Sequence, residues 1–303
     1  MRRFIINVSI FIAITFITFA LVFFCAFKYI EDFEHNKTTY ISVSHEVNVQ
    51  RSLKNIDTCS SNKILLIGGS NVGFGFDSQM LLNAFNMPVF NTGTHGGIGL
   101  RLQIEFFKDY INKGDIVVIM PEYEQFYGLF LGDEAMIRIV ASDTNLKNKM
   151  SVRQIIHSVS YTFLALVDMV EMTDFTGVYG SCSLNKYGDV SEYRKHIMIN
   201  PKNIEGKIDY EAITYLKSFV DSCPSSIVLL PPVYQDKSFD INIDKINQID
   251  RILSENGIGY DAKPSRYRFD DSLMYDTPYH CTTEGAIIRT NLVIEDIQRV
   301  LGK

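Results

Sequence analysis

The chain has 303 residues, of which 46% are hydrophobic and 21% are charged, and its formal net charge is −6. This length suits one large α/β domain, or one domain that carries an insertion. An acidic chain without a basic tract argues against nucleic acid as a partner.

An uncharged apolar segment opens the chain and runs from Phe4 to Phe27. A helix of this length would measure about 36 Å, which exceeds the roughly 30 Å hydrocarbon core of a bilayer. Arg2 and Arg3 precede the segment, so the positive-inside rule leaves the N-terminus in the cytoplasm. A cleaved signal peptide is the alternative, although its apolar part is normally shorter and ends in small residues. We therefore predict a single-pass transmembrane signal anchor in the cell membrane at residues 1–28, with the rest of the chain extracytoplasmic.

Residues 29–61 are polar and lack clear periodicity, which predicts a stalk between the anchor and a domain at 62–303. The domain begins with short apolar runs typical of buried strands. These runs alternate with segments whose apolar residues recur at helical spacing. The expected elements are a strand at Lys63–Ile67, a helix at Asp77–Phe85, a strand at Pro88–Asn91, a helix at Leu100–Asn112 and a strand at Asp115–Met120. This alternation predicts an α/β fold with a parallel sheet.

The alternation weakens between about 128 and 205, which we interpret as a helical insertion that covers the site or meets a partner. The insertion contains a long, mostly apolar helix at Ser151–Met172 and a polar, loop-like stretch at Tyr179–Asn200. The α/β pattern then returns as helix Asp209–Asp221, strand Ser226–Pro231, helix Ile243–Asn256, a short strand near Ile258–Tyr260 and helix Thr283–Leu301.

Two segments far apart in the sequence carry candidate chemistry. Gly68-Gly69-Ser70 follows a buried strand, at the sheet edge where open α/β folds place their ligands. His280 comes shortly after Asp276, and a histidine with an acid is what a serine needs to become a nucleophile. Glycine-rich turns after strands are common, so the alternative is a tight turn in which Ser70 caps a backbone amide.

Cofactor and metal patterns are absent from the sequence. The glycines are not followed by the lysine of a nucleotide loop, and no dinucleotide fingerprint opens the next helix. The chain has neither a zinc-type histidine pair nor a paired-cysteine motif. We therefore expect no cofactor and no metal. The four cysteines outside the anchor allow disulfides or unpaired thiols equally: Cys59, Cys182, Cys223 and Cys281.

These motifs together resemble the SGNH or GDSL-like hydrolase superfamily. Ile67-Gly68-Gly69-Ser70 is similar to its first block, Asn91-Thr92-Gly93 to its second, and Tyr279-His280 to its fifth. The resemblance covers residues 63–127 and 226–300 and implies a flavodoxin-like, three-layer α/β/α fold. It also implies that Ser70 is the nucleophile and His280 the base, oriented by Asp276. The amides of Ser70 and Gly93 would form an oxyanion hole, with Asn91 and Glu122 as further oxyanion or substrate-binding residues.

Two positions depart from the family pattern. The third block normally has an asparagine that donates to the oxyanion, whereas this chain has Glu122 near that place. An ionised carboxylate cannot donate a hydrogen bond, so Glu122 is either a protonated donor or a carboxylate that binds substrate hydroxyls or backbone amides. The family also spaces acid and base as Asp-x-x-His. Here Asp276 is one residue further from His280, which leaves Asp270 or Asp271 as alternative partners.

Within the superfamily, the chain is most similar to membrane-anchored branches that decorate polysaccharides or teichoic acids. The resemblance implies a serine-dependent acyl esterase or O-acyltransferase that acts on an extracytoplasmic polysaccharide or cell-envelope glycan. Its expected partners are a glycan or acylated glycan, the membrane, and a membrane acyl-donor protein. Because of the two departures, the alternative is a catalytically inactive, SGNH-like protein that binds glycan or assists assembly.

Overall fold

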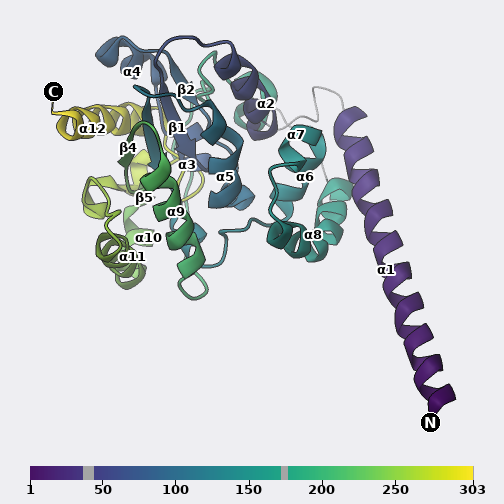
Figure 1. The fold of residues 1–303 in the computed structure, drawn as a ribbon. Helices are drawn as coiled ribbons and strands as arrows, with labels where there is room; N and C mark the ends of the chain where they lie inside the picture. The colour runs from purple at the N-terminus through teal and green to yellow at the C-terminus, as the bar shows by residue number, and fades with distance from the viewer. Residues whose placement is uncertain (37–43, 172–176, 303) are drawn as a thin grey trace.

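A parallel sheet of four strands lies at the centre of the computed structural model, which describes residues 1–36, 44–171 and 177–302 (Figure 1). The strands are β1 (Ile64–Gly68), β2 (Val89–Asn91), β3 (Ile116–Met120) and β4 (Ser226–Leu229). Their order is β2-β1-β3-β4, and all three neighbouring pairs are parallel. The α/β class and the parallel sheet predicted from the alternation are confirmed.

The strands form where the sequence has unbroken runs of Ile, Leu and Val. Every residue of β1 and β3 is buried, as expected for central strands covered on both faces. Alternate side chains enter two separate hydrophobic clusters. Leu65, Ile67, Val117 and Ile119 belong to one cluster, whereas Ile64, Leu66, Ile116 and Val118 belong to the other.

Helices cover both faces of this sheet (Figure 1). One cluster is completed by α5 (Leu100–Phe107), α9 (Tyr210–Ser222) and α11 (Ile243–Glu255). The other includes side chains of the short α3 (Ser70–Gly73), of α4 (Ser78–Phe85) and of α12 (Thr283–Leu301). Asp77 caps α4 by accepting from the amide of Gln79, and Thr282 caps α12 in the same way through Gly285.

The smaller elements lie mainly between β4 and α12. A two-stranded parallel sheet joins β5 (Tyr234–Gln235) to β6 (Arg268–Phe269), and α10 (Asp236–Ile241) follows β5. The strand predicted near Ile258–Tyr260 is wrong, because this segment has no ladder pairing. Only the next residue, Asp261, donates a backbone hydrogen bond to Leu229. Single 3-10 turns occupy Gly96–Ile98, Lys108–Tyr110, Tyr123–Phe126, Gly177–Tyr179, Ser181–Ser183, Pro264–Tyr267 and Asp271–Leu273.

The predicted insertion is helical at first and irregular later. It contains α6 (Glu134–Ser142), α7 (Thr144–Lys147) and α8 (Val152–Glu171), which group together beside α1 in Figure 1. The long helix predicted at Ser151–Met172 corresponds to α8, and Met172 itself lies outside the described residues. From 180 to 209 the chain has only short turns and isolated bridges, as predicted for a loop-like stretch.

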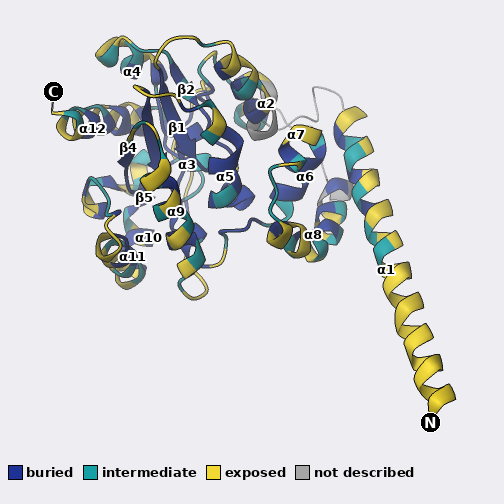
Figure 2. Ribbon diagram, in the orientation of Figure 1, coloured by how far each residue is buried: buried dark blue, intermediate teal, exposed yellow. Residues whose placement is uncertain are grey.

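The N-terminal region differs from the prediction of an anchor followed by a polar stalk. Helix α1 (Arg2–Asn36) continues past residue 28, and its apolar N-terminal part stands clear of the domain (Figure 2). It is long and apolar enough to cross a membrane. Residues 44–57, predicted as stalk, form helix α2 (Ser44–Asp57), which buries Val49 and Ile56 against the domain. The sequence did not predict α2 because its apolar stripe is small. This stripe becomes part of a hydrophobic core only when the helix packs against the domain surface.

Candidate active site

A cavity of about 770 Å³ opens at the carboxyl ends of β1 and β3. Ser70 follows β1 and Glu122 follows β3, so both reach this edge of the sheet, where parallel α/β folds bind ligands. His280 enters from the loop before α12, and the glycine-rich loop after β2 forms another wall. The insertion contributes Tyr179 and the segment 198–202 to the wall of the cavity.

Ser70 is held by Glu122 at the start of α3. The Ser70 hydroxyl donates to Glu122 Oε1 at 3.2 Å, and the same oxygen accepts from the Asn71 amide at 3.1 Å and from Asn71 Nδ2 at 3.3 Å. The Glu122 side chain is almost completely buried. A carboxylate that accepts three donors acts as a hydrogen-bond acceptor, which matches the second of the two roles considered for Glu122.

Two glycines leave the space that this carboxylate occupies. A Cβ atom on Gly69 would lie 2.4 Å from Glu122 Oε1, and one on Gly96 would lie 1.9 Å from Oε2. Any larger residue at either position would therefore expel the carboxylate from its place. Gly69 and Gly96 thus leave the space that lets the Glu122 carboxylate approach Ser70.

Arg289 stabilises the turn at Ser70 and Asn71 through hydrogen bonds to Asn71. It projects from α12, is fully buried, and donates to both the backbone oxygen of Asn71 and, at 2.7 Å, to Asn71 Oδ1. Its guanidinium also lies 4.7 Å from the centre of the Phe76 ring. Burial lowers the pKa of Arg289, an effect opposed by nearby groups that include Glu122.

His280 and Asp276 form a second hydrogen-bonded group in the cavity. His280 Nδ1 lies 2.8 Å from Asp276 Oδ1 and 3.3 Å from the Tyr179 hydroxyl, which also donates to Asp276. The imidazole stacks on Phe74, with 4.0 Å between ring centres and 8° between planes. The loop therefore brings Asp276 to the imidazole despite the extra residue in the spacing. Asp271 instead pairs with Lys237 and Gln235.

The surroundings favour an ionised Asp276. Burial alone would raise the pKa of this carboxyl, but the hydrogen bonds from His280 and Tyr179 and the attraction of the His280 ring hold the pKa below its ordinary value. An ionised Asp276 can only accept, so Nδ1 of His280 carries a proton. In the neutral imidazole, Nε2 is then the nitrogen able to take a proton from another group.

The predicted residues are not all assembled as an active triad. Ser70 and His280 line the same cavity, but the Ser70 hydroxyl is bonded to Glu122 and not to the imidazole. The Gly93 amide, predicted as an oxyanion donor, donates to Asn91 Oδ1 at 2.9 Å. Asn91 is fully buried and bonds to Val72 and Asp189, so neither residue is free to bind an oxyanion or substrate here. The reason is that Asn91 satisfies buried backbone groups around the turn.

A third acidic side chain lies deeper in the cavity wall. Burial raises the pKa of Glu124, while a hydrogen bond from Tyr279 and the charge of Lys202 partly offset this rise. The Lys202 ammonium lies 3.6 Å from Glu124 Oε1 and comes from the insertion. The cavity therefore contains carboxylates, one lysine and two histidines, His95 and His280, which suits a polar ligand with hydroxyl groups.

Several site residues were missed in the sequence. Asn71 adjoins the serine, but nothing local indicates that its side chain binds Glu122. Tyr179 and Phe74 contact His280 only because the chain folds back, so no spacing could identify them. The five cysteines are free thiols, and within the described ranges no group of three or more His, Cys, Asp or Glu side chains could hold a metal.

No model of a known protein family matches this chain, and neither a curated protein nor a solved structure matches it.

Proposed function

We propose that the protein is a serine-dependent acyl esterase or O-acyltransferase with an SGNH-like, flavodoxin-like domain. The observation that carries the proposal is that Ser70 and the hydrogen-bonded pair His280–Asp276 face one cavity at the carboxyl edge of a parallel sheet. Nucleophile, base and orienting acid are then present in one place. The resemblance of the three motifs to the SGNH or GDSL-like superfamily supports the same assignment.

The reaction begins when the Ser70 hydroxyl turns from Glu122 towards Nε2 of His280. Ser70 Oγ attacks the acyl carbonyl carbon while its proton passes to Nε2, and Asp276 stabilises the resulting imidazolium. The Ser70 amide donates to the oxyanion of the tetrahedral intermediate. Collapse of this intermediate transfers the proton to the departing alcohol and leaves an ester on Ser70. Water or a sugar hydroxyl then attacks this ester, and His280 again accepts and returns the proton.

Glu122 holds Ser70 in a resting position in this proposal. Its Oε1 keeps the turn at Ser70 and Asn71 in place, and its charge disfavours an oxyanion nearby. Substrate binding must therefore shift the hydroxyl towards the imidazole before the reaction. A hydroxyl-rich ligand could replace Ser70 as the donor to Glu122, which would couple acceptor binding to activation of the serine.

The substrate is an extracytoplasmic polysaccharide or cell-envelope glycan. A membrane-spanning α1 would keep the domain near glycans that are made at the membrane, with the N-terminus in the cytoplasm. The carboxylates, histidines and lysine of the cavity suit the hydroxyl groups of a sugar or its acyl ester, and a membrane protein would supply the acyl group in the transferase reaction.

A non-catalytic role in glycan binding or assembly is the second candidate. The specific observation in its favour is that the Ser70 hydroxyl and the Gly93 amide both bond to neighbouring side chains. In this case Glu122, Glu124 and Lys202 would bind sugar hydroxyls, and no acyl-enzyme would form.

Labelling with a fluorophosphonate probe separates the two functions, because this probe reacts only with an activated serine. We expect the full-length protein to be labelled, and labelling to be lost in Ser70→Ala and His280→Ala. Ser160→Ala, which changes an exposed serine on α8, is the matched control and should be labelled normally. A folded parent protein that resists the probe but binds glycan would support the non-catalytic candidate.

A further inference from the structure

Helix α8 has an inverted distribution of side chains. Its exposed side carries large apolar residues, which are Val152 (74% exposed), Ile155 (48%), Ile156 (68%), Leu164 (51%) and Val167 (55%). Its buried side carries small or polar residues, which are Gln154, Ser158, Thr162 and Ala165, together with Met169. At 100° per residue the two sets lie on opposite halves of the helix. An ordinary surface helix has the reverse pattern, so the exposed half needs an apolar environment.

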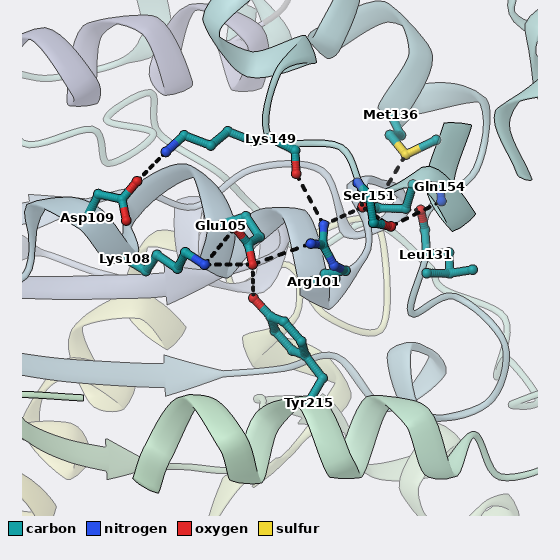
Figure 3. A network of polar contacts seen from close by, with 10 residues as sticks. All are labelled: Arg101, Glu105, Lys108, Asp109, Leu131, Met136, Lys149, Ser151, Gln154 and Tyr215. Carbon is teal, nitrogen blue, oxygen red and sulfur yellow. Dashed lines mark hydrogen bonds and ion pairs between the residues drawn. The ribbon is translucent and has the colours of Figure 1, made fainter. Parts of the chain in front are cut away.

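Polar contacts hold the buried side of α8 against the domain. Gln154 donates to Leu131 O at 3.2 Å and accepts from Arg101 of α5 at 2.6 Å (Figure 3). Arg101 also lies close to Glu105, which accepts from Tyr215 of α9. This network determines which half of α8 faces outwards, because turning the helix would leave several of these buried groups without partners.

Helix α8 contacts α1 within the part of α1 that is apolar and exposed. The rings of Phe19 and Phe163 lie 6.4 Å apart, and α8 packs along α1. On the other side of this contact, towards the C-terminus of α1, Glu31 pairs with Lys147 and Glu34 with Arg138. The contact with α8 is therefore the part of the domain nearest to the free N-terminal half of α1 (Figure 2).

The length of α1 places this contact inside the bilayer if α1 spans it. The stretch from Phe4 to Phe19 would measure only about 24 Å as a helix, which is shorter than a hydrocarbon core of roughly 30 Å. A span that begins at Phe4 needs about 20 residues and so ends near Phe23. Phe19 then lies about 6 Å below the outer boundary of the hydrocarbon core, and Phe163 of α8 lies beside it.

We propose that α8 is a second membrane element, whose exposed half inserts into the outer leaflet beside α1. The occupant of this surface is lipid. Small and polar residues towards the protein with large apolar residues outwards are typical of helices that face lipid. Among the α8 residues whose exposure the structure describes, Arg153 and Ser160 are the exposed polar residues on or beside this half, and Arg153 pairs with Glu211 of α9.

Tryptophan fluorescence can test the depth of α8, because the chain contains no Trp. Single replacements Leu164→Trp, Ile241→Trp and Phe11→Trp would be made in the full-length chain, reconstituted into phosphatidylcholine and phosphatidylglycerol vesicles. Leu164 and Ile241 are a matched pair, since each is 51% exposed, but Ile241 lies on α10, away from α1. Phe11 reports whether α1 is inserted. Thermal unfolding should confirm that each variant folds like the parent.

We expect brominated acyl chains to quench Leu164→Trp and Phe11→Trp, and to leave Ile241→Trp unchanged. Bromine near the headgroups should quench Leu164→Trp more strongly than Phe11→Trp. Bromine near the chain ends should quench Phe11→Trp more strongly than Leu164→Trp. Emission of Leu164→Trp should also shift to shorter wavelength on reconstitution. Emission of Leu164→Trp that matches Ile241→Trp, with Phe11→Trp quenched, would overturn the proposal and indicate a protein partner on α8. An unquenched Phe11→Trp would overturn it as well, because α1 would then lie outside the bilayer.

Discussion

Ser70 Oγ donates a hydrogen bond of 3.2 Å to Oε1 of Glu122, a residue 52 positions further along the chain. The two residues follow the neighbouring strands β1 and β3, whose last paired residues are Gly68 and Met120. Parallel pairing in this register brings the two strand ends to the same level of the sheet. A serine expected to bond with a histidine is therefore bonded to a carboxylate, and this relationship leads to the first prediction.

Glu122→Gln should increase the reactivity of Ser70. The amide oxygen can accept from Ser70 and Asn71 as Oε1 does, and the amide nitrogen would then lie beside Gly96, where Oε2 lies now. The change removes a negative charge close to Ser70 and adds a hydrogen-bond donor to the wall of the cavity. We expect fluorophosphonate labelling to become faster by about 100-fold, the size typical of one oxyanion donor. The fraction of protein labelled at a series of reaction times at neutral pH measures this rate.

Glu122→Ala is the control for that prediction, because it removes the charge without adding a donor and leaves the Asn71 amide unpaired. This variant should be less stable than the parent and should not be labelled as fast as the Gln variant. If Gln and Ala variants were equally inert while folded, a carboxylate-dependent function would be indicated instead.

Asp276→Asn should abolish most of the reactivity of Ser70. An amide nitrogen at this position would donate to Nδ1 of His280, so the proton of the neutral ring would move to Nε2, which could no longer act as a base. We expect labelling to slow by about 10⁴-fold, as with the equivalent change in serine hydrolases of known mechanism. Asp244→Asn, at an exposed position of α11, should leave the rate unchanged. Normal labelling of Asp276→Asn would remove Asp276 from the mechanism.

The difference in free energy of unfolding between the parent and Asp276→Asn should depend on pH. The pKa of Asp276 in the folded protein is lower than its ordinary value of 3.8, so the unfolded chain binds the proton more tightly. The contribution of Asp276 to the free energy of unfolding is then complete above the unfolded pKa and is lost as pH falls through the folded pKa. We expect the difference in stability between parent and Asp276→Asn to narrow below about pH 4. Denaturant titrations across the acidic range would measure it, and a difference that widens there would contradict the sign.

Arg289→Met should destabilise the domain and loosen the turn at Ser70. Arg289 is fully buried and makes charge-assisted hydrogen bonds to Asn71, so its loss should cost about 2 kcal/mol or more in the free energy of unfolding. Labelling should slow as well, because Asn71 links Arg289 to Glu122. Arg299→Met is the matched control on the same helix, because the Arg299 side chain is 57% exposed and the buried Asp296 keeps Arg266 and Tyr267 as partners, so this loss should cost below about 1 kcal/mol. Equal effects of the two changes would contradict the supporting role of Arg289.

Lys63→Met should reduce stability without affecting the site. The Lys63 ammonium lies 2.7 Å from Asp115 Oδ2, and both side chains are fully buried at the edge of the sheet opposite the cavity. Removing one partner leaves a buried charge, which costs about 3–5 kcal/mol. Lys217→Met, which breaks an exposed pair with Asp221, should cost less than about 1 kcal/mol. Chemical denaturation measures both, and labelling of Ser70 in the folded Lys63 variant should keep the parent rate.

Local patterns predicted most elements of this fold. Runs of Ile, Leu and Val predicted β1 and β3, because a strand covered on both faces must be apolar throughout. Helical spacing predicted α4 and α12 to within a residue or two. Helix α2 was missed because its apolar stripe is small, and the strand near 258–260 was wrongly predicted because a short apolar run alone does not provide a pairing partner.

The apolar helix α1, the α/β class, and the positions of Ser70 and His280 at the ends of elements could be predicted from the sequence, because each depends on neighbouring residues. Only long-range packing brings Ser70 to Glu122, the Asn91 amide to Asp189, and Arg289 to Asn71. It also decided which half of α8 faces outwards. These outcomes depend on which side chains satisfy buried polar groups across distant segments, and no local pattern contains that information.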